Sequence, residues 1–361
     1  MFCDNAYATP FRGSHFLKCC FVAQMTEGPR TPDGRCRCQV AEGKGIQERS
    51  NHDCGADANT KDENGLTALM RAAGEGHIDV VQWLVNDCDA DVNTKRNNRE
   101  TALTMAATGG HVEVVQWLVN DCGADVNTKD KHGLTALMRA ADAGFIDVVR
   151  WLVNDGGADM NTKANRGWTT LMIAAKAGHI DVVQWLIHDY GVDVNTKDSH
   201  GETALMRASD SGRINVVRCL VNGGADVNTM NNDEETALMR ACGRGQIDVV
   251  RCLITYCGAA VNTKNNNGET ALFKAACRDH IDVVRFLVND CHVNVNVKNK
   301  DGYSVTRLAA DRGYYDIVRL LTPFVLPDRQ MSTQNTGEVV GYNLLTFDMS
   351  YTGFVKLGYP S

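Results

Sequence analysis

The chain has 361 residues, 43% of them hydrophobic and 22% charged, which is a soluble composition and enough material for a large buried core. Its formal net charge of -7 argues against a protein drawn by bulk charge to nucleic acid or anionic lipid, although a local basic stripe is not excluded. The sequence has no run of about 18 apolar residues and no convincing secretory signal, so we expect no membrane span, reduced thiols among the 14 cysteines, and a cytoplasmic or nuclear location.

Residues 1–53 form the first segment. Pro29 and Pro32 lie among several glycines, and these residues break helices. Positions that are apolar in the units described next hold Arg35 and Lys44 here. We therefore expect either a poorly ordered segment or a degenerate polar cap.

A repeated unit fills residues 54–322. The stretch TALMRAA occurs twice, and related stretches recur at a period of 34 residues six times and 33 residues once. Each begins with Thr or Ser, at positions Thr67, Thr101, Thr135, Thr169, Thr203, Thr236, Thr270 and Ser304. A fixed period of this length indicates a stack of units, none of which can bury its apolar face alone.

Each unit predicts two helices and a loop. In the first unit, Thr67 can cap a short helix whose apolar face includes Leu69 and Met70, and Gly74 and Gly76 end it. A second helix begins near Ile78 and has a broad apolar face. The fold class is therefore all-α, a helical solenoid with a helix-turn-helix and a hairpin-like loop in every repeat.

The last segment, residues 323–361, has a different pattern. Pro323 should stop the final helix. In residues 345–351 apolar and polar residues alternate, which is typical of a strand. This strand could pack on the last unit, pair with a partner or be disordered. The eighth unit before it exchanges core residues for Thr306 and Arg307, as a C-terminal cap would.

The sequence resembles the ankyrin-repeat family in its stretches GLTALMRAA, GHIDVVQWLV and GADVN. The resemblance covers eight consecutive units over about three quarters of the chain. It implies that the loop tips and the start of each first helix line a concave groove that binds partners. It also implies that the loop asparagines Asn93, Asn127, Asn161, Asn195 and Asn228 are candidate substrates for asparaginyl hydroxylation, whereas our own expectation is a structural role in the turn.

The sequence departs from the family pattern in two ways. The usual Thr-Pro-Leu-His reads Thr-Ala-Leu-Met, so that a flexible Met side chain takes the place of a hydrogen-bonding His. The loop glycine is replaced by Arg99 in the second unit and by Glu234 in the sixth, and we expect irregular turns there.

The candidate partner-binding residues are those that vary at the expected groove. Trp168 is the most distinctive, as either a binding hot spot or a shield for the adjacent loop. The full set comprises a basic row on the first helices, residues before the capping positions, and loop tips: Arg71, Arg139, Arg207, Arg240, Lys274, Leu66, Leu134, Trp168, Tyr303, Lys131, His132, Arg166 and His200.

Two basic rows need an explanation. One is the first-helix row from Arg71 to Lys274, and the other follows the Asn-Thr pairs at the bases of the loops. The second row comprises Lys61, Lys95, Lys129, Lys163, Lys197, Lys264 and Lys298. Each row could contact an acidic partner or simply keep the surface soluble.

We expect no catalytic residue, cofactor or metal ion. The sequence has no glycine-rich phosphate loop, no G-x-S-x-G elbow and no H-E-x-x-H or paired C-x-x-C spacing. The recurrent histidines His77, His111, His179 and His280 are expected to make structural hydrogen bonds. Cysteines at equivalent positions of neighbouring units should lie too far apart for disulfides.

These observations favour a non-catalytic, monomeric interaction scaffold or adaptor that binds one or more proteins on the concave face, with an acidic partner segment suggested by the basic rows. Two alternatives remain. The Lys and Arg rows could bind nucleic acid or another acidic ligand, or the tail could recruit a larger complex.

Overall fold

A computed structural model describes residues 57–325. The predictions for residues 1–53, and the strand expected at 345–351, lie outside the described residues. Within residues 57–325 no helix is long and apolar enough to cross a bilayer.

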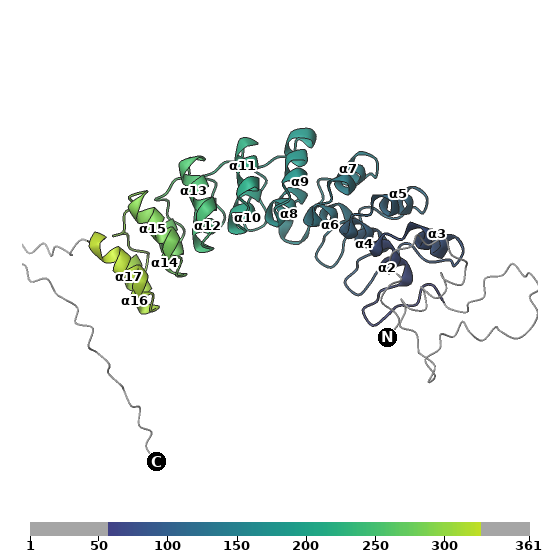
Figure 1. Ribbon diagram of the computed structural model, residues 1–361, viewed down its shortest axis with the longest axis horizontal. Helices are drawn as coiled ribbons and strands as arrows, with labels where there is room; N and C mark the ends of the chain where they lie inside the picture. Colours follow the sequence, from purple (N-terminus) through teal and green to yellow (C-terminus); the bar gives the residue numbers. More distant parts are fainter. Residues whose placement is uncertain (1–56, 326–361) are drawn as a thin grey trace, which may run out of the picture. The chain divides into compact units, whose positions relative to one another are not determined.

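The described residues form eight successive helix pairs, which we call repeats 1 to 8 (Figure 1). The first helices are α2 (Ala68–Glu75), α4 (Ala102–Gly109), α6 (Ala136–Ala143), α8 (Thr170–Ala177), α10 (Ala204–Asp210), α12 (Ala237–Gly243), α14 (Ala271–Ala276) and α16 (Val305–Asp311). The second helices are α3 (Ile78–Asn86), α5 (Val112–Asn120), α7 (Ile146–Asn154), α9 (Ile180–Gln184), α11 (Ile214–Asn222), α13 (Ile247–Thr255), α15 (Ile281–Asn289) and α17 (Tyr315–Leu321). Short 3-10 turns lie at η2 (Asn165–Gly167) and η4 (Thr322–Phe324), and α9 continues into a π-helical segment, η3 (Trp185–Tyr190).

First helices pack on first helices along one side of the row, and second helices on second helices along the other. The row in residues 57–325 curves, with the first helices on its inner side (Figure 1). We call this inner side, together with the loops between repeats, the first-helix face.

The start of each first helix is fixed as the sequence predicts. The Thr135 hydroxyl accepts a hydrogen bond from the Met138 N–H at 3.4 Å, which satisfies one of the free amides of the first turn. Corresponding bonds are made at every capping position except Thr270, whose side chain makes no cap bond. The end of α2 differs slightly from expectation, since Gly74 lies inside the helix and only Gly76 is the C-cap.

The core of the stack is built from small and flexible side chains. Ala72 and Ala73 of α2 are fully buried, as are their equivalents in α4 and α6, because alanine allows first helices to approach closely. The Met that replaces the family His is also buried, for example Met70 and Met206 at 1% exposure. Repeat 8 is the exception, since α16 buries only Val305 and Ala309.

Polar side chains join each repeat to the next. The His111 ring nitrogen lies 3.0 Å from the Gly74 carbonyl, and His179 bonds to the Asp142 carbonyl in the same way. Lys61 donates to the Lys95 carbonyl at 3.0 Å, and Asn127 accepts from the Asp159 N–H at 2.9 Å. These contacts, with a similar one from His280 to the Gly243 carbonyl, give three of the four recurrent histidines, and several loop lysines and asparagines, a structural role.

The expectation of irregular turns at Arg99 and Glu234 is wrong. Arg99 has φ +67° and Glu234 has φ +58°, close to the +77° of Gly65 at the same loop position. Both turns close, with Arg99 N–H bonded to the Arg96 carbonyl at 2.8 Å and Glu234 N–H to the Asn231 carbonyl at 3.0 Å. The surrounding stack therefore holds two ordinary side chains in a backbone region that favours glycine.

Candidate functional site

The first-helix basic row is engaged within the chain. In repeat 1, Arg71 of α2 lies 3.6 Å from Asp62, which is nine residues earlier, in the loop before this helix. In repeat 3, Arg139 pairs with Asp130 and also reaches Glu100 of repeat 2 at 2.9 Å. The Asp130 side chain is fully buried, and the guanidinium offsets the free-energy cost of removing this carboxylate from water.

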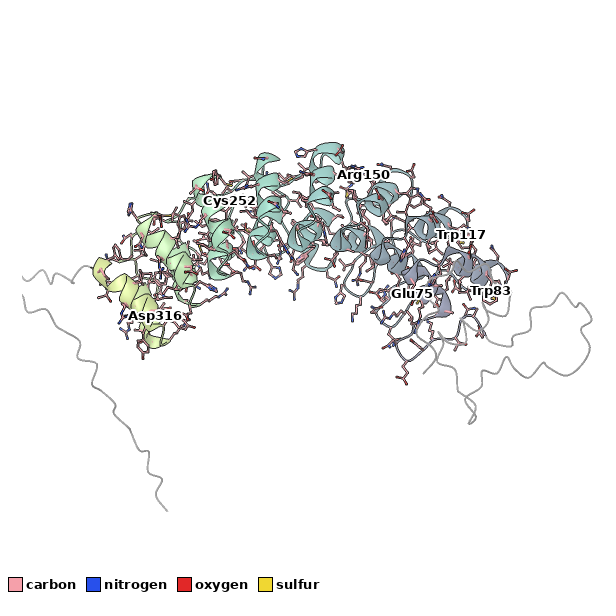
Figure 2. The ribbon with its side chains drawn as sticks, in the orientation of Figure 1. Glu75, Trp83, Trp117, Arg150, Cys252 and Asp316 are labelled. Carbon is pink, nitrogen blue, oxygen red and sulfur yellow. The ribbon has the colours of Figure 1, made fainter. Side chains whose placement is uncertain are left out.

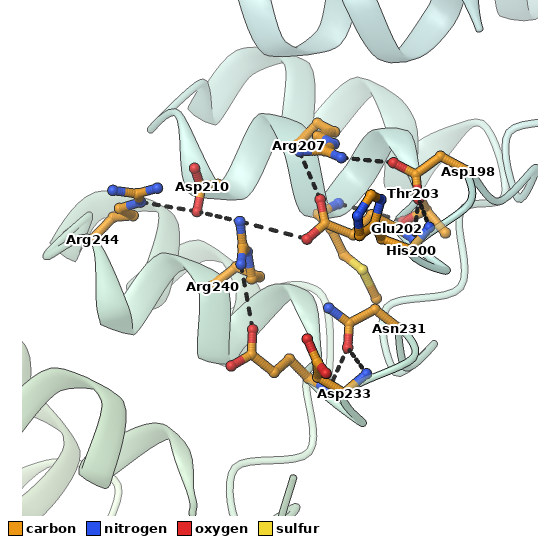
Figure 3. A network of polar contacts seen from close by, with 12 residues as sticks. Asp198, His200, Glu202, Thr203, Arg207, Asp210, Asn231, Asp233, Arg240 and Arg244 are labelled. Carbon is orange, nitrogen blue, oxygen red and sulfur yellow. Dashed lines mark hydrogen bonds and ion pairs between the residues drawn. The ribbon is translucent and has the colours of Figure 1, made fainter. Parts of the chain in front are cut away.

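A second set of ion pairs runs from repeat 5 to repeat 7, and Figure 3 shows its part in repeats 5 and 6. Arg207 lies 2.6 Å from Asp198 and 2.8 Å from Glu202. Arg240 of repeat 6 reaches back to Glu202 at 3.5 Å and also binds Asp210 at 3.0 Å. Lys274 of repeat 7 then pairs with Glu235 and Glu269. We call the ion pairs of repeats 1 to 3 and those of repeats 5 to 7 together the charge ladder.

The charge ladder shifts the pKa values of its carboxylates. Burial alone would raise the pKa of Glu235, but the hydrogen bond and charge of Lys274, with Arg240, outweigh it and hold that pKa below its usual value. Burial also raises the pKa of Asp198, but the hydrogen bond and charge of Arg207 together with the backbone N–H groups of Glu202 and His200 outweigh it and hold that pKa below its usual value. Both carboxylates are therefore ionised at neutral pH, and the basic row carries little free charge for a partner.

Repeat 4 interrupts the charge ladder. The position of Asp130 and Asp198 is occupied by Ala164, and the position of Arg139 and Arg207 by Ile173. Ala164, Ile173 and Met138 form a small cluster of buried residues separate from the main core, with Leu134 and Trp168 packed against it. We call these five residues the apolar cluster.

Trp168 forms the accessible edge of the apolar cluster. It is half-buried, and the Arg207 guanidinium lies 4.2 Å from its ring centroid while Lys176 lies at 5.1 Å. These distances are typical of cation–π contacts. Its Nε1 is buried and makes no hydrogen bond within the described residues. Trp168 therefore both covers the adjacent loop and presents part of an aromatic ring at the first-helix face.

The loop tips of repeats 3 to 5 carry cations that the charge ladder does not use. Lys131, His132 and Arg166 are exposed, and within residues 57–325 their side chains make no ion pair. His200 is also exposed, and its Nδ1 lies 3.2 Å from the Ser199 hydroxyl. Arg166 has φ +64°, a strained backbone at the tip of η2.

The other candidates lie apart from this group. Leu66 is half-buried against the main core in repeat 1, and Tyr303 in repeat 8 stacks with Arg307 at 5.0 Å. The structure thus brings together Leu134, Trp168 and the tips of repeats 3 to 5, and it separates them from the ends of the row.

Sequence reasoning missed the acidic half of the charge ladder. An acid stands nine residues before the arginine in repeats 1, 3 and 5, and a Glu stands just before the capping Thr at Glu100, Glu202, Glu235 and Glu269. That recurrent spacing was the available signal. In the described part of the chain, no three His, Cys, Asp or Glu side chains are grouped as metal ligands would be.

Comparison with known proteins supports one family. The model of ankyrin repeats (3 copies) matches five overlapping segments, residues 44–130, 87–164, 122–198, 190–265 and 238–330. A comparison with curated proteins gives no match to the chain. Because the family model covers well over half of the sequence and the eight helix pairs follow its periodicity, the chain belongs to the ankyrin-repeat family.

Proposed function

We propose that the chain is a non-catalytic interaction module, a scaffold or adaptor that binds a partner protein on the first-helix face at repeats 3 to 5. Ankyrin repeats are in general protein-interaction modules. The observation that carries the proposal is the gap in the charge ladder at repeat 4, where an apolar cluster with an accessible Trp168 stands among exposed basic tips. An aromatic residue ringed by polar groups is a common centre of a protein interface.

The distribution of charge on the first-helix face indicates which chemical features a partner segment would need. The guanidiniums of Arg139, Arg207 and Arg240 already face carboxylates, so a partner would have to compete for them. Lys131 and Arg166 are exposed, and each lies within three residues of a member of the apolar cluster in the sequence. The arrangement suits a partner segment that places an apolar side chain at Trp168 and carboxylates at the tips.

A random-peptide display library selected on the immobilised full chain tests this proposal. Selected peptides should combine an apolar residue with nearby Asp or Glu. Calorimetry with the best peptide should show about tenfold weaker binding for the double variant Lys131→Glu/Arg166→Glu, a change of about 1.4 kcal/mol. The matched control is Arg150→Glu/Arg285→Glu, which changes the net charge equally on exposed sites of α7 and α15.

The outcome also discriminates between the alternatives. If both double variants weaken peptide binding equally, binding depends on the net charge of the chain and not on the loop tips of repeats 3 and 4. Loss of peptide binding on removal of residues 323–361 would move the site to the tail. Binding of unrelated DNA duplexes, with affinity falling steeply as salt rises, would favour the nucleic-acid alternative.

A further inference from the structure

Repeat 6 differs from the other described repeats in its cysteines. Repeats 1 to 4 have a Trp on the second helix, whereas repeats 5 and 6 have Cys219 and Cys252 there. Cysteines also recur in the loop after the second helix, at Cys88, Cys122, Cys257 and Cys291. Among residues 57–325, only repeat 6 combines a cysteine at both positions.

The two cysteines of repeat 6 lie close together. Cys252 is in the last turn but one of α13, and the Cys257 N–H donates to the Cys252 carbonyl at 3.2 Å. Their Sγ atoms are 4.0 Å apart, and both are free thiols. A disulfide needs the sulfurs at about 2 Å and the Cα atoms within about 7 Å. The backbone hydrogen bond between the two residues keeps them close at the end of α13, and a movement of about 2 Å would bring the sulfurs to bonding distance.

A pocket of about 360 Å³ opens beside Cys252, among second helices on the outer side of the row, where Figure 2 places this residue. Cys252 forms part of its wall together with Arg218, Arg251 and Tyr256. Arg218 lies 5.6 Å from the centre of the Tyr256 ring, and that ring is 79% exposed. The pocket therefore places the Arg218 guanidinium on the same wall as Cys252, whereas the Arg251 guanidinium lies 4.3 Å from the centre of the Phe286 ring. Asp248, also in its wall, offsets part of that positive charge.

We propose that Cys252 and Cys257 are a redox-active dithiol, oxidised to an intramolecular disulfide by a small anionic disulfide of the glutathione class. The half-exposed Cys257 thiolate attacks one sulfur of oxidised glutathione, so that a mixed disulfide forms and one glutathione leaves. The buried Cys252 thiolate then attacks the Cys257 sulfur and releases the second glutathione. Two protein thiols are oxidised, one glutathione disulfide is reduced, and the two thiol protons end on the two glutathione molecules.

The surroundings explain why this pair responds to redox poise and does not react rapidly. Burial and the neighbouring Cys252 raise the pKa of Cys257 to about 11, while Arg218 acts in the opposite direction. The thiolate fraction at neutral pH is therefore small, and exchange is slow. Proximity favours the second step, because the resolving thiol is already 4.0 Å away.

The test equilibrates the full chain in a series of reduced and oxidised glutathione mixtures, followed by acid quenching, alkylation and tryptic digestion. Cleavage after Arg251 and Lys264 gives CLITYCGAAVNTK, a single peptide that contains both cysteines. We expect it to become lighter by two hydrogen atoms and to carry no alkyl group. The peptide that begins at Cys219 contains a single cysteine and serves as the internal control, expected to stay alkylated in the same mixtures.

The variant Cys257→Ser and a denatured sample complete the design. In the variant, Cys252 should stay alkylated, because no resolving partner remains. In denaturant, the disulfide should need a more oxidising mixture, since the fold no longer holds the sulfurs together. The proposal is overturned if the folded peptide carries two alkyl groups, two glutathiones or a bond to another cysteine, or if denaturation makes the bond easier to form.

Discussion

The guanidinium of Arg207 lies 4.2 Å from the centre of the Trp168 ring, in place of the carboxylate that its counterparts find in the preceding repeat. Arg139 and Arg240 reach back to Glu100 and Glu202 respectively. One change of residue type before a capping Thr therefore converts an ion pair between repeats into a stacking contact. Together with Ala164 and Ile173, this change interrupts the charge ladder at repeat 4.

Repeat 4 can be converted to the ladder pattern by two substitutions. Ile173→Arg alone places a charge at a site that is 4% exposed and should destabilise the fold by about 3 kcal/mol. Ala164→Asp alone buries an unpaired carboxylate and should also destabilise. Together they recreate the pairing of Asp130 with Arg139, so we expect a favourable coupling of about 1 to 3 kcal/mol in a double-mutant cycle by urea unfolding. Additive effects would contradict the equivalence of these positions.

The capping residues offer a matched comparison. Thr135→Ala removes a hydroxyl that accepts from the Met138 N–H and should lower the free energy of unfolding by about 1 kcal/mol. Thr270→Ala should cost clearly less, because that side chain makes no cap bond. Both residues are nearly buried, at 2% and 4% exposure, so the lost packing is similar and cancels in the comparison. Equal losses in urea titrations would show that packing, and not the cap, fixes the helix start.

Glycine should stabilise the two strained loops. Arg99→Gly and Glu234→Gly each relieve a left-handed backbone, which costs an ordinary residue about 1 kcal/mol, partly offset by the greater freedom of glycine when unfolded. The reverse change, Gly65→Ala, should destabilise, because its Cβ would lie 2.5 Å from the Asn97 side-chain oxygen. Thermal unfolding of the three variants should rank both glycine variants above the parent chain, and Gly65→Ala below it.

Acid should weaken the charge ladder. The pKa of Glu235 is lowered in the folded chain, so its contribution to stability is complete above its unfolded pKa of about 4.3 and is lost as the pH falls towards the folded value. Glu235→Gln should therefore reduce stability at pH 7 and flatten its decline between about pH 5 and pH 3. The exposed Glu63→Gln serves as the control and should leave the curve unchanged. Parallel curves for the parent chain and the Glu235 variant would contradict this assignment.

Most of the fold could be predicted from the periodicity of the sequence. The capping Thr set the register of each helix pair, and runs such as IDVVQWLV placed the second helices, because local capping and apolar spacing depend only on nearby residues. The family model and the eight helix pairs confirm the ankyrin fold.

The candidate site was less predictable because its residues act across repeats. Arg139 appeared free when its unit was considered by itself, since Glu100 lies in the previous unit, and the pairing of Arg71 with Asp62 was missed because it joins a helix to a loop nine residues earlier. Similarly, comparing cysteines only at equivalent positions hid the closeness of Cys252 and Cys257 within one unit. The tolerance of the stack for Arg99 in a glycine turn also depends on neighbouring repeats.

The polar bonds between repeats have a consequence for how this protein can change its length. His111 of repeat 2 reaches back to Gly74, His179 of repeat 4 to Asp142, and Arg213 of repeat 5 to the Lys176 carbonyl, all through the same pair of positions. Duplication or loss of one whole unit would therefore recreate the same junction and leave both neighbours correctly joined. A deletion of a few residues would instead displace every later partner, so whole-unit gain and loss is the form of length variation that the architecture tolerates.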